Sequence, residues 1–374
     1  MSTPNCSHAR NPRTVEHMAK PDELESQSLV IWSSPSTKGA GAYQLWENYS
    51  LPLSKVINRV MLLRGHTEYD SVSNPQANLN LKSIFWSLTK FRSLLGDAST
   101  THVITSISQS DILYGLFVRP FSRSRWTIYV LGQPYPVKNQ TGKLKSLIWK
   151  RLWILAAKRS DQIIGVSEYI SALISKEIPG RQITTVYPSL LNPSRLAQCE
   201  QSSEPPIRVG FVGRLSVEKD PGLFCDIVED FDEVEGLVFG DGLLRESLAE
   251  RTERISFLGF TPQDQIYPNV DVLMMTSRSE GLPMVLVEAS HAGVVPLVAD
   301  VGGCAEAIHP DNRDLLVIPR GEREHVAVWR ERLRLLLSPV LRDAVLRRQR
   351  EWADRNFDVG ANSRLLAELA VPEV

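Results

Sequence analysis

Two glutamates in the stretch Thr276–Ala289 are the residues of this chain best placed to do chemistry. The stretch reads TSRSEGLPMVLVEA, and Glu280 precedes Glu288 by eight positions. Glu280 is predicted to lie on a loop, and Glu288 about one and a half turns inside the helix that follows. Ionised carboxylates accept hydrogen bonds from hydroxyl groups. With a phosphate group between them, a sugar on one side and a ribose on the other would supply those hydroxyls.

The start of that helix is a predicted phosphate site. Residues 270–275 form a short apolar run typical of a buried parallel strand, and Pro283 suits the first helical position because its missing N–H costs nothing there. The next backbone N–H groups, those of Met284, Val285 and Leu286, are expected to lack partners inside the helix and to point outward. Such a terminus binds anions, and phosphate most naturally. An ordinary strand, loop and helix with two solvated acids is the alternative.

Apolar runs alternate with helical stretches along the chain, which predicts an α/β fold with parallel, doubly wound sheets. In the first half the strand candidates are Leu29–Trp32, Val60–Leu63, Val103–Ser106, Trp126–Leu131 and Gln162–Val166. Helices are expected from about Tyr43 and near residues 78–95 and 141–159. In the second half the strand candidates are Ile207–Val212, Leu237–Phe239, Ile255–Phe260, Val270–Met275 and Val294–Ala299.

Glycine-containing turns follow several of these strands, at the edge where open α/β sheets bind ligands. Glycine lets a ligand approach the backbone closely. Candidate ligand contacts are therefore Gly39 and Gly41 in the first half and Gly213 and Gly240 in the second. For Gly39 and Gly41 a plain turn is the alternative.

Length and composition indicate a globular protein of two domains, because 374 residues with 43% hydrophobic and 23% charged side chains exceed one typical domain. We predict a mobile tail over residues 1–27, a first domain over residues 28–200 and a second over residues 201–352. A C-terminal helix in residues 353–374 is expected to pack back on the first domain. The stretch around residues 190–206, which contains Pro and Ser, is the expected hinge.

Charge and cysteine content restrict the partners and the compartment. Residues 1–200 carry 23 Lys and Arg against 13 Asp and Glu, whereas residues 201–374 carry 19 against 30. Halves of opposite sign suggest different partners rather than different folds. The four cysteines are scattered without metal-binding spacing, which fits a reducing compartment. No apolar run approaches about 18 residues and no signal-peptide core is present, so we expect a cytoplasmic protein.

The order and spacing of the second-half motifs resemble the donor-binding domain of the retaining family-4 glycosyltransferases, a family of glycosyl transferases group 1. The matching motifs are Gly213-Arg-Leu-x-x-Glu-Lys219, Gly240-Asp-Gly242, Phe257-Leu-Gly259, the Glu280/Glu288 pair and Gly302-Gly303. The resemblance covers roughly residues 29–360 and is weak before residue 160. It implies the GT-B fold, in which two Rossmann-like domains face each other across a cleft.

The same resemblance implies the reaction. A sugar would pass from a UDP- or GDP-sugar to a glycan or lipid-linked acceptor with retention of configuration, in the synthesis of a cell-surface polysaccharide or glycolipid. Negative charge grows on the leaving pyrophosphate, so fixed positive charge would stabilise the transition state. Arg214 is suited to bidentate phosphate contact, and Lys219 adds a compact charge five residues on. With the helix N-terminus they could replace a divalent metal, so we expect no metal and no cofactor. Two surface cations after a strand are the alternative.

Roles for the remaining site residues are also carried over from the family. Glu288 would hold the ribose hydroxyls, and Glu280 would hold the hydroxyls of the donor sugar near its reacting carbon. Glu280, Arg214 and Lys219 are therefore the predicted catalytic residues. The nucleotide sugar would be bound by Gly213, Arg214, Lys219, Gly240, Met284, Val285, Leu286 and Glu288.

The family comparison adds contacts from outside this loop. The main chain around Phe257 and Leu258 would face the base, and Gly39 and Gly41 would approach the donor from the first domain. Many relatives carry a His just after the strand that corresponds to Trp126–Leu131, beside the donor sugar. This chain has Gln133 or the Gly132 main chain there, and Gln cannot shuttle a proton.

A basic stretch in the first half is a second functional signal. Between Asp111 and Asp161 there are ten basic residues and no acidic one. A helical apolar stripe lies inside this stretch, with Trp149 and Trp153 beside it; its members are Leu144, Leu147, Ile148, Leu152 and Leu155. A basic helix with tryptophans can rest on an anionic membrane surface, which would make residues 143–159 a peripheral contact on the cytoplasmic face. A stripe that packs on the core is the alternative. Nucleic acid is not expected as a partner.

Two other functions stay open at this point. A hydrolase that uses Glu280 and Glu288 as paired carboxylates would need them about 5 Å apart, and a phosphate cradle between them would then be pointless. A non-catalytic subunit that binds a nucleotide sugar would be consistent with the missing family His. A sugar transferase is the function that the motifs favour.

Overall fold

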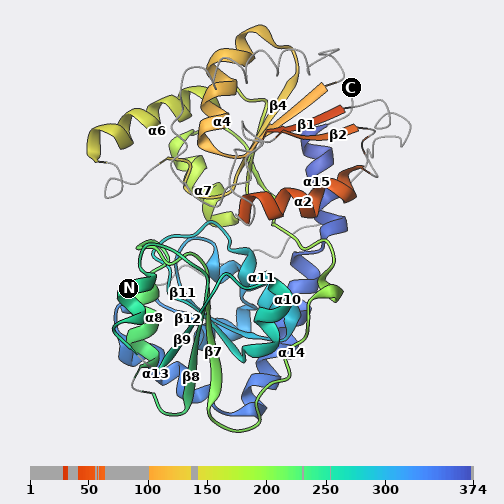
Figure 1. The fold of residues 1–374 in the computed structure, drawn as a ribbon. Coiled ribbons are helices and arrows are strands. Elements are labelled where there is room, and N and C mark those ends of the chain that lie inside the picture. The colour runs from red at the N-terminus through yellow and green to blue at the C-terminus, as the bar shows by residue number, and fades with distance from the viewer. Residues whose placement is uncertain are drawn as a thin grey trace, which may run out of the picture.

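The computed structural model describes residues 28–32, 41–54, 57, 59–63, 101–135, 142–229, 231–252 and 254–371. Figure 1 shows two α/β domains, one above the other, with the C-terminal helices running from the lower domain to the upper one. The predicted tail over residues 1–27, Gly39 and the predicted helix near residues 78–95 lie outside the described residues.

The first sheet has six parallel strands in the order β2-β1-β3-β4-β5-β6. They are β1 (Ser28–Trp32), β2 (Arg59–Leu63), β3 (Thr101–Thr105), β4 (Arg125–Val130), β5 (Gln162–Gly165) and β6 (Ile183–Thr185). Its helices are α2 (Gly41–Ser54), α4 (Ser108–Leu113), η1 (Tyr114–Val118), η2 (Arg119–Phe121), α6 (Lys143–Ala157) and α7 (Glu168–Glu177). Strand β6 was not predicted, because three half-buried residues with two threonines give no apolar run.

The second sheet also has six parallel strands, in the order β12-β11-β10-β7-β8-β9. They are β7 (Ile207–Val212), β8 (Val234–Phe239), β9 (Ile255–Gly259), β10 (Val272–Met275), β11 (Val295–Ala299) and β12 (Val317–Ile318). Every residue of β10 and β11 is buried, as expected for parallel strands covered by helices on both faces. The predicted α/β class with two parallel, doubly wound sheets is confirmed.

Helices precede, connect and follow these strands. Those before β11 are η3 (Pro193–Arg195), α8 (Pro221–Val228), α9 (Arg245–Ala249), α10 (Gln263–Ile266), η4 (Tyr267–Asn269) and α11 (Met284–Ala292). Those after it are η5 (Cys304–Ala307), η6 (Pro310–Asn312), α12 (Arg313–Leu316), η7 (Arg320–Glu322), α13 (Val326–Leu335), α14 (Pro339–Asn356) and α15 (Val359–Ala370).

The last two helices connect the domains. Helix α14 packs against α11 of the second domain, whereas α15 packs against α2, β3 and β4 of the first. Asn362 on α15 donates a hydrogen bond to Ser189 Oγ at 2.8 Å. The predicted division at residue 352 falls inside α14, so the residues from 353 onward comprise the end of α14 and the whole of α15.

The linker between the domains is bound to a buried carboxylate. Asp271, just before β10, has a fully buried side chain and pairs with Arg208 at 2.8 Å. Its oxygens also accept hydrogen bonds from the Ser202 N–H and hydroxyl, at 2.8 and 2.9 Å. Burial alone would raise the pKa of Asp271, but the hydrogen bonds from Arg208 and Ser202 hold it below its usual value. The expected hinge is therefore attached to the second domain at Ser202.

Replacing Asp271 with Ala should lower the free energy of unfolding by about 3–5 kcal/mol, because the Arg208 guanidinium then loses its buried carboxylate. Urea unfolding near neutral pH measures this loss. The wild-type advantage should shrink as the pH falls toward the depressed pKa of Asp271, since the protonated acid no longer pairs.

The matched control is Asp232→Ala, which removes the exposed carboxylate that pairs with Arg254. That change should cost less than about 1 kcal/mol, because solvent screens exposed ion pairs. Equal losses in the two variants would contradict the assignment of Asp271 as the buried anchor of the linker.

Candidate active site

Loops at the carboxyl ends of β7 and β10 bring together two of the three predicted catalytic residues, Lys219 and Glu280. In a parallel sheet these ends share one edge, so loops far apart in sequence meet there. The Lys219 ammonium lies 2.5 Å from Glu280 Oε1. The side chain of Glu280 is only 8% exposed and that of Lys219 29% exposed. The pair is therefore largely shielded from water, where its charges act more strongly than on an open surface.

Arg323, which was not predicted as a site residue, connects the loop after β7 with the loop after β10. Arg323 is 5% exposed, forms an ion pair with Asp220 and donates from Nε to the Ser277 carbonyl at 3.1 Å. Asp220, next to Lys219, has a left-handed backbone with φ 50°, the one non-glycine residue with positive φ in the described part of the chain. Such a conformation is unfavourable for residues other than glycine unless surrounding contacts impose it. Arg323 supplies one such contact, and Arg278 pairs with the same carboxylate at 2.7 Å.

Arg214 lies on the same loop but is exposed, and its guanidinium makes no hydrogen bond or ion pair to another described residue. The main chain beside it is packed tightly against the next loop. A Cβ on Gly240 would lie 1.9 Å from the Gly213 carbonyl oxygen, so glycine at 240 is needed for backbone packing. The structure therefore gives Gly240 a packing role and leaves Arg214 available to a ligand.

The peptide between Glu280 and Gly281 is enclosed by backbone from both domains. A Cβ on Gly281 would lie 2.1 Å from the Leu131 carbonyl oxygen of the first domain. On the other side, a Cβ on Gly302 would lie 1.9 Å from the Glu280 carbonyl oxygen, and Gly303 donates its N–H to the Gly281 carbonyl at 2.7 Å. Gln133, two residues after Leu131, is exposed.

A second carboxylate, that of Glu306, forms hydrogen bonds from the second domain to the first. Glu306, three residues after Gly303, accepts hydrogen bonds from the N–H groups of Glu168 and Tyr169 at 2.7 and 2.8 Å. These groups open α7, so the carboxylate lies at the positive end of that helix. Tyr187 also donates its hydroxyl to Glu306 at 3.1 Å. Burial raises the pKa of Glu306, against the hydrogen bonds that stabilise its charged form.

The start of α11 differs from the prediction by one residue. Pro283 is the N-cap and not the first helical residue, since the helix begins at Met284. The N–H of Leu286 donates to the Pro283 carbonyl at 3.2 Å, so the prediction that it lacks a partner was wrong. The N–H groups of Met284 and Val285 bond to no described residue and can still meet a phosphate.

Glu288 is more enclosed than a simple ribose contact requires. It is 5% exposed and accepts a short hydrogen bond from the Tyr267 hydroxyl. Burial raises the pKa of Glu288, although the hydrogen bond from Tyr267 opposes that shift. Tyr267 itself is buried, so its ring and hydroxyl fix the carboxylate in one place.

The predicted base-facing segment is partly engaged within the protein. The Phe257 carbonyl accepts a hydrogen bond from Arg245 at 3.5 Å, and the Gly259 carbonyl accepts one from the Gly240 N–H at 2.7 Å. The side chain of Leu258 is 49% exposed. Gly41 begins α2, which packs against α15.

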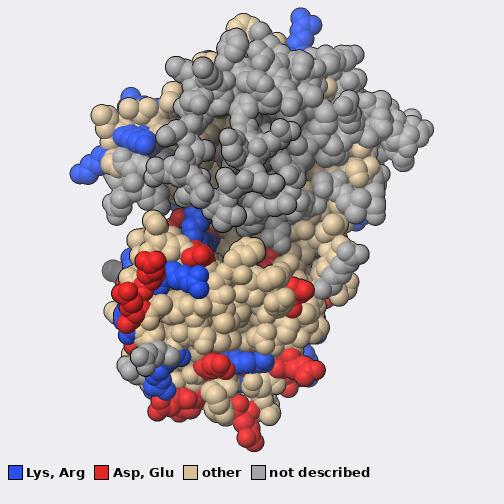
Figure 2. Space-filling view, in the orientation of Figure 1, with Lys and Arg blue, Asp and Glu red and all other residues tan. Residues whose placement is uncertain are grey.

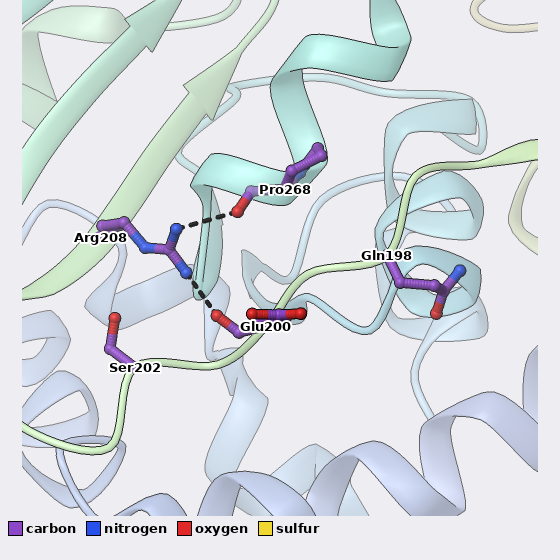
Figure 3. Close-up of a pocket in the computed structure, with 5 residues that line it drawn as sticks. All are labelled: Gln198, Glu200, Ser202, Arg208 and Pro268. Carbon is purple, nitrogen blue, oxygen red and sulfur yellow. Dashed lines mark hydrogen bonds between the residues drawn. The ribbon is translucent and has the colours of Figure 1, made fainter.

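A shallow pocket outside this region is lined by Gln198, Glu200, Ser202, Arg208 and Pro268 (Figure 3). Arg208 donates to the carbonyls of Pro268 and Glu200 at 2.9 and 2.7 Å and also pairs with Asp271. Each of its three guanidinium nitrogens is thus used inside the protein. The pocket therefore lies where Arg208 and Asp271 hold the linker, and none of the residues that line it is a predicted site residue.

The described residues include no cluster of three or more His, Cys, Asp or Glu side chains that could hold a metal ion. His102 lies inside β3 and is buried, and burial lowers its pKa to about 4. It is not at the Glu280 loop, and His66 lies outside the described residues.

Three residues of this region were missed from the sequence. Each of them forms a hydrogen bond with a residue 21 to 138 positions away in the chain; they are Arg323, Tyr267 and Glu306. Only Glu306 had a local signal, because it follows the Gly302-Gly303 turn by three residues.

Residues 206–335 match the family model described as glycosyl transferases group 1. The O-antigen biosynthesis glycosyltransferase WbnH of Escherichia coli is 26% identical over 238 residues, covering 60% of this chain and 65% of its own. This chain thus aligns with slightly less than two thirds of that relative. A Campylobacter jejuni alpha-1,4-N-acetyl-D-galactosaminyltransferase named for a PP-undecaprenol-linked substrate is 29% identical over 142 residues, covering 34% and 40%.

The fold comparison extends over nearly the whole chain. The structure of Alr3699/HepE from Anabaena, in complex with UDP and glucose, superimposes with a TM-score of 0.70 at 15% identity. It covers 91% of this chain and 98% of the other. At this level of identity the likeness establishes the fold alone. The chain therefore has the GT-B fold, and its residues 206–335 are similar to the glycosyl transferases group 1 family.

Proposed function

We propose that this protein is a retaining glycosyltransferase that moves a sugar from a UDP- or GDP-sugar to a glycan or lipid-linked acceptor in polysaccharide biosynthesis. The observation that carries the proposal is the enclosed Lys219–Glu280 pair, which lies between the two domains of a GT-B fold. WbnH, which is named for O-antigen biosynthesis, and HepE, which was solved with UDP and glucose, support the substrate class.

The positive groups of the site are suited to the leaving group. As the bond between the sugar and the diphosphate breaks, the electron pair goes to a phosphate oxygen and negative charge grows there. The Lys219 ammonium has three hydrogens and can keep Glu280 while it meets a phosphate oxygen. Exposed Arg214 and the N–H groups of Met284 and Val285 supply further donors. We expect these groups to serve without a metal ion.

The two glutamates would then hold the substrate in position. Glu280 would accept hydrogen bonds from the donor sugar, and its place is fixed by backbone from both domains. Glu288 would bind the ribose, with Tyr267 orienting the carboxylate. The acceptor hydroxyl would attack the reacting carbon, and its proton would pass to the leaving phosphate. Gln133 would give hydrogen bonds where many relatives have His, without taking the proton.

The hydrolase alternative fits the geometry less well. Its nucleophile would have to be a carboxylate that is open to the substrate carbon. Glu280 is paired with the Lys219 ammonium, and one oxygen of Glu288 is held by the Tyr267 hydroxyl. Neither carboxylate is therefore arranged as a nucleophile.

UDP or GDP should raise the melting temperature of the protein in the presence of EDTA. A ligand that binds only the folded state stabilises it by about 2.7 kcal/mol at a hundredfold excess over its dissociation constant. Thermal-shift titrations with and without Mg²⁺ measure the effect, and adenosine diphosphate is the control for base selectivity. Stabilisation that requires Mg²⁺ or Mn²⁺ would overturn the metal-free site.

Arg214→Ala and Lys219→Ala should each reduce kcat on the order of 100-fold, because each removes a positive donor at the developing charge. Only Lys219→Ala should also lower the melting temperature, since it leaves the shielded Glu280 carboxylate without its cation. The control is Arg254→Ala, at the opposite edge of the sheet, where an exposed pair with Asp232 is lost. Wild-type turnover in the Arg214/Lys219 double variant would exclude these residues from catalysis.

Tyr267→Phe tests the ribose contact, because it removes only the hydroxyl that orients Glu288. We expect the KM for the nucleotide sugar to rise about tenfold, which corresponds to the free energy of one hydrogen bond to a charged group. The KM for the acceptor should not change. A rise in both values would indicate general distortion and would contradict a role confined to the donor.

A further inference from the structure

Helix α6 presents an apolar face to solvent. Five large side chains on one side of the helix are exposed, namely Leu144 (72%), Leu147 (46%), Ile148 (50%), Leu152 (37%) and Leu155 (47%). Figure 1 shows α6 extending from the upper domain on the side opposite α2 and α15. The stripe therefore does not pack on the core, and the core-packing alternative is wrong for these residues.

The opposite face of α6 attaches the helix to the domain. Trp153 is fully buried and donates its indole N–H to Asp111 Oδ2 at 2.9 Å, and Ala156 and Ala157 are also buried. Burial raises the pKa of Asp111 to about 7. Trp153 is thus a core residue, and the expectation that it belongs to a membrane-facing set was wrong. Because the inner face is already packed, the outer leucines are not needed to hold α6 in place.

Positive charge lies beside and within the apolar face, since Arg151 is four residues from both Leu147 and Leu155. Lys143, Lys145 and Arg151 are exposed, and none has a carboxylate within ion-pair distance in the described part of the chain. Figure 2 shows blue side chains without red ones at this edge, whereas the red side chains gather on the lower domain. Lys150 is different, since its ammonium pairs with Glu177 at 2.6 Å and is therefore part of the fold.

The inner side of α6 is connected to the candidate active site. The Tyr135 hydroxyl donates to Glu177 at 3.0 Å, and Lys150 lies over the Tyr135 ring, 5.3 Å from its centroid. The segment from Leu131 to Tyr135 therefore runs from the contact with Gly281 to the inner face of α6. A partner on the outer face would lie on the same domain segment that borders the Glu280 loop.

We propose that the outer face of α6 docks on an anionic bilayer, with its leucines and isoleucine in the acyl boundary and its basic residues among the headgroups. Exposed aliphatic side chains bordered by Lys and Arg are typical of helices that lie in the plane of the interface. A second copy of the chain fits less well, because pairing the two faces would bring Lys143, Lys145 and Arg151 of each copy together. The inference rests on the proposed function only in that it gives a lipid-linked acceptor a reason to meet this domain.

The test is sedimentation of the full chain with vesicles of phosphatidylcholine alone or with 30% phosphatidylglycerol. We expect binding to the anionic vesicles only, weakening as salt rises because exposed charges are screened. The triple variant Lys143→Gln, Lys145→Gln, Arg151→Gln should bind on the order of 100-fold more weakly. The quadruple variant Leu144→Ser, Leu147→Ser, Ile148→Ser, Leu155→Ser should lose binding at every salt concentration.

Matched controls change exposed residues of the same kinds elsewhere. Lys176→Gln, Arg347→Gln and Arg355→Gln remove three exposed bases, and Leu243→Ser with Val340→Ser removes two exposed aliphatic side chains. Both should bind like wild type. UDP stabilisation, measured on every preparation, reports on folding and on the proposed function independently of the membrane.

Three outcomes would overturn the docking proposal. These are no binding of wild type to anionic vesicles, unchanged binding of the quadruple variant, and a dimer in light scattering that the quadruple variant abolishes, which would assign the face to a second copy. If vesicles bind but UDP does not stabilise the chain, the proposed function fails while the docking surface stands.

Discussion

The position of Glu280 depends on a close backbone contact that only glycine permits. Its peptide with Gly281 lies between the Leu131 carbonyl of the first domain and Gly302 of the second, where any Cβ would overlap main-chain atoms. The Gly302 backbone also has φ 60°, which side chains rarely adopt. A candidate catalytic carboxylate is thus located by two domains at once. This geometry requires backbone from both domains, so neither sheet forms it alone.

The other contacts between the domains reinforce this arrangement at the same place. Glu306 binds the first N–H groups of α7, and the Ser167 hydroxyl donates to the Gly281 carbonyl at 3.2 Å. Farther along the chain, α15 packs against α2 of the first domain. The polar contacts therefore concentrate beside the Glu280 loop. Any motion that separated the two domains here would have to break these hydrogen bonds.

The fold and part of the site could be predicted from the sequence for a physical reason. Apolar runs bounded by glycine identify buried parallel strands, and the parallel arrangement then brings Lys219 and Glu280 to one edge, although 61 positions separate them. Arg323 and Tyr267 could not be predicted, because their partners are chosen by tertiary packing. Helix α6 shows the same limit: both of its faces are apolar, and periodicity does not say which one meets the core.

The charge asymmetry between the two halves agrees with the proposed docking of α6 on a bilayer. The excess of Lys and Arg in residues 1–200 includes the exposed bases of α6, whereas residues 201–374 carry 19 basic against 30 acidic side chains. An anionic surface would attract the first domain and repel the second. The molecule would therefore meet a bilayer with α6 leading and the acidic second domain turned toward the solvent (Figure 2). The exposed apolar side chains of α6 would then add affinity for the bilayer, after charge has oriented the molecule.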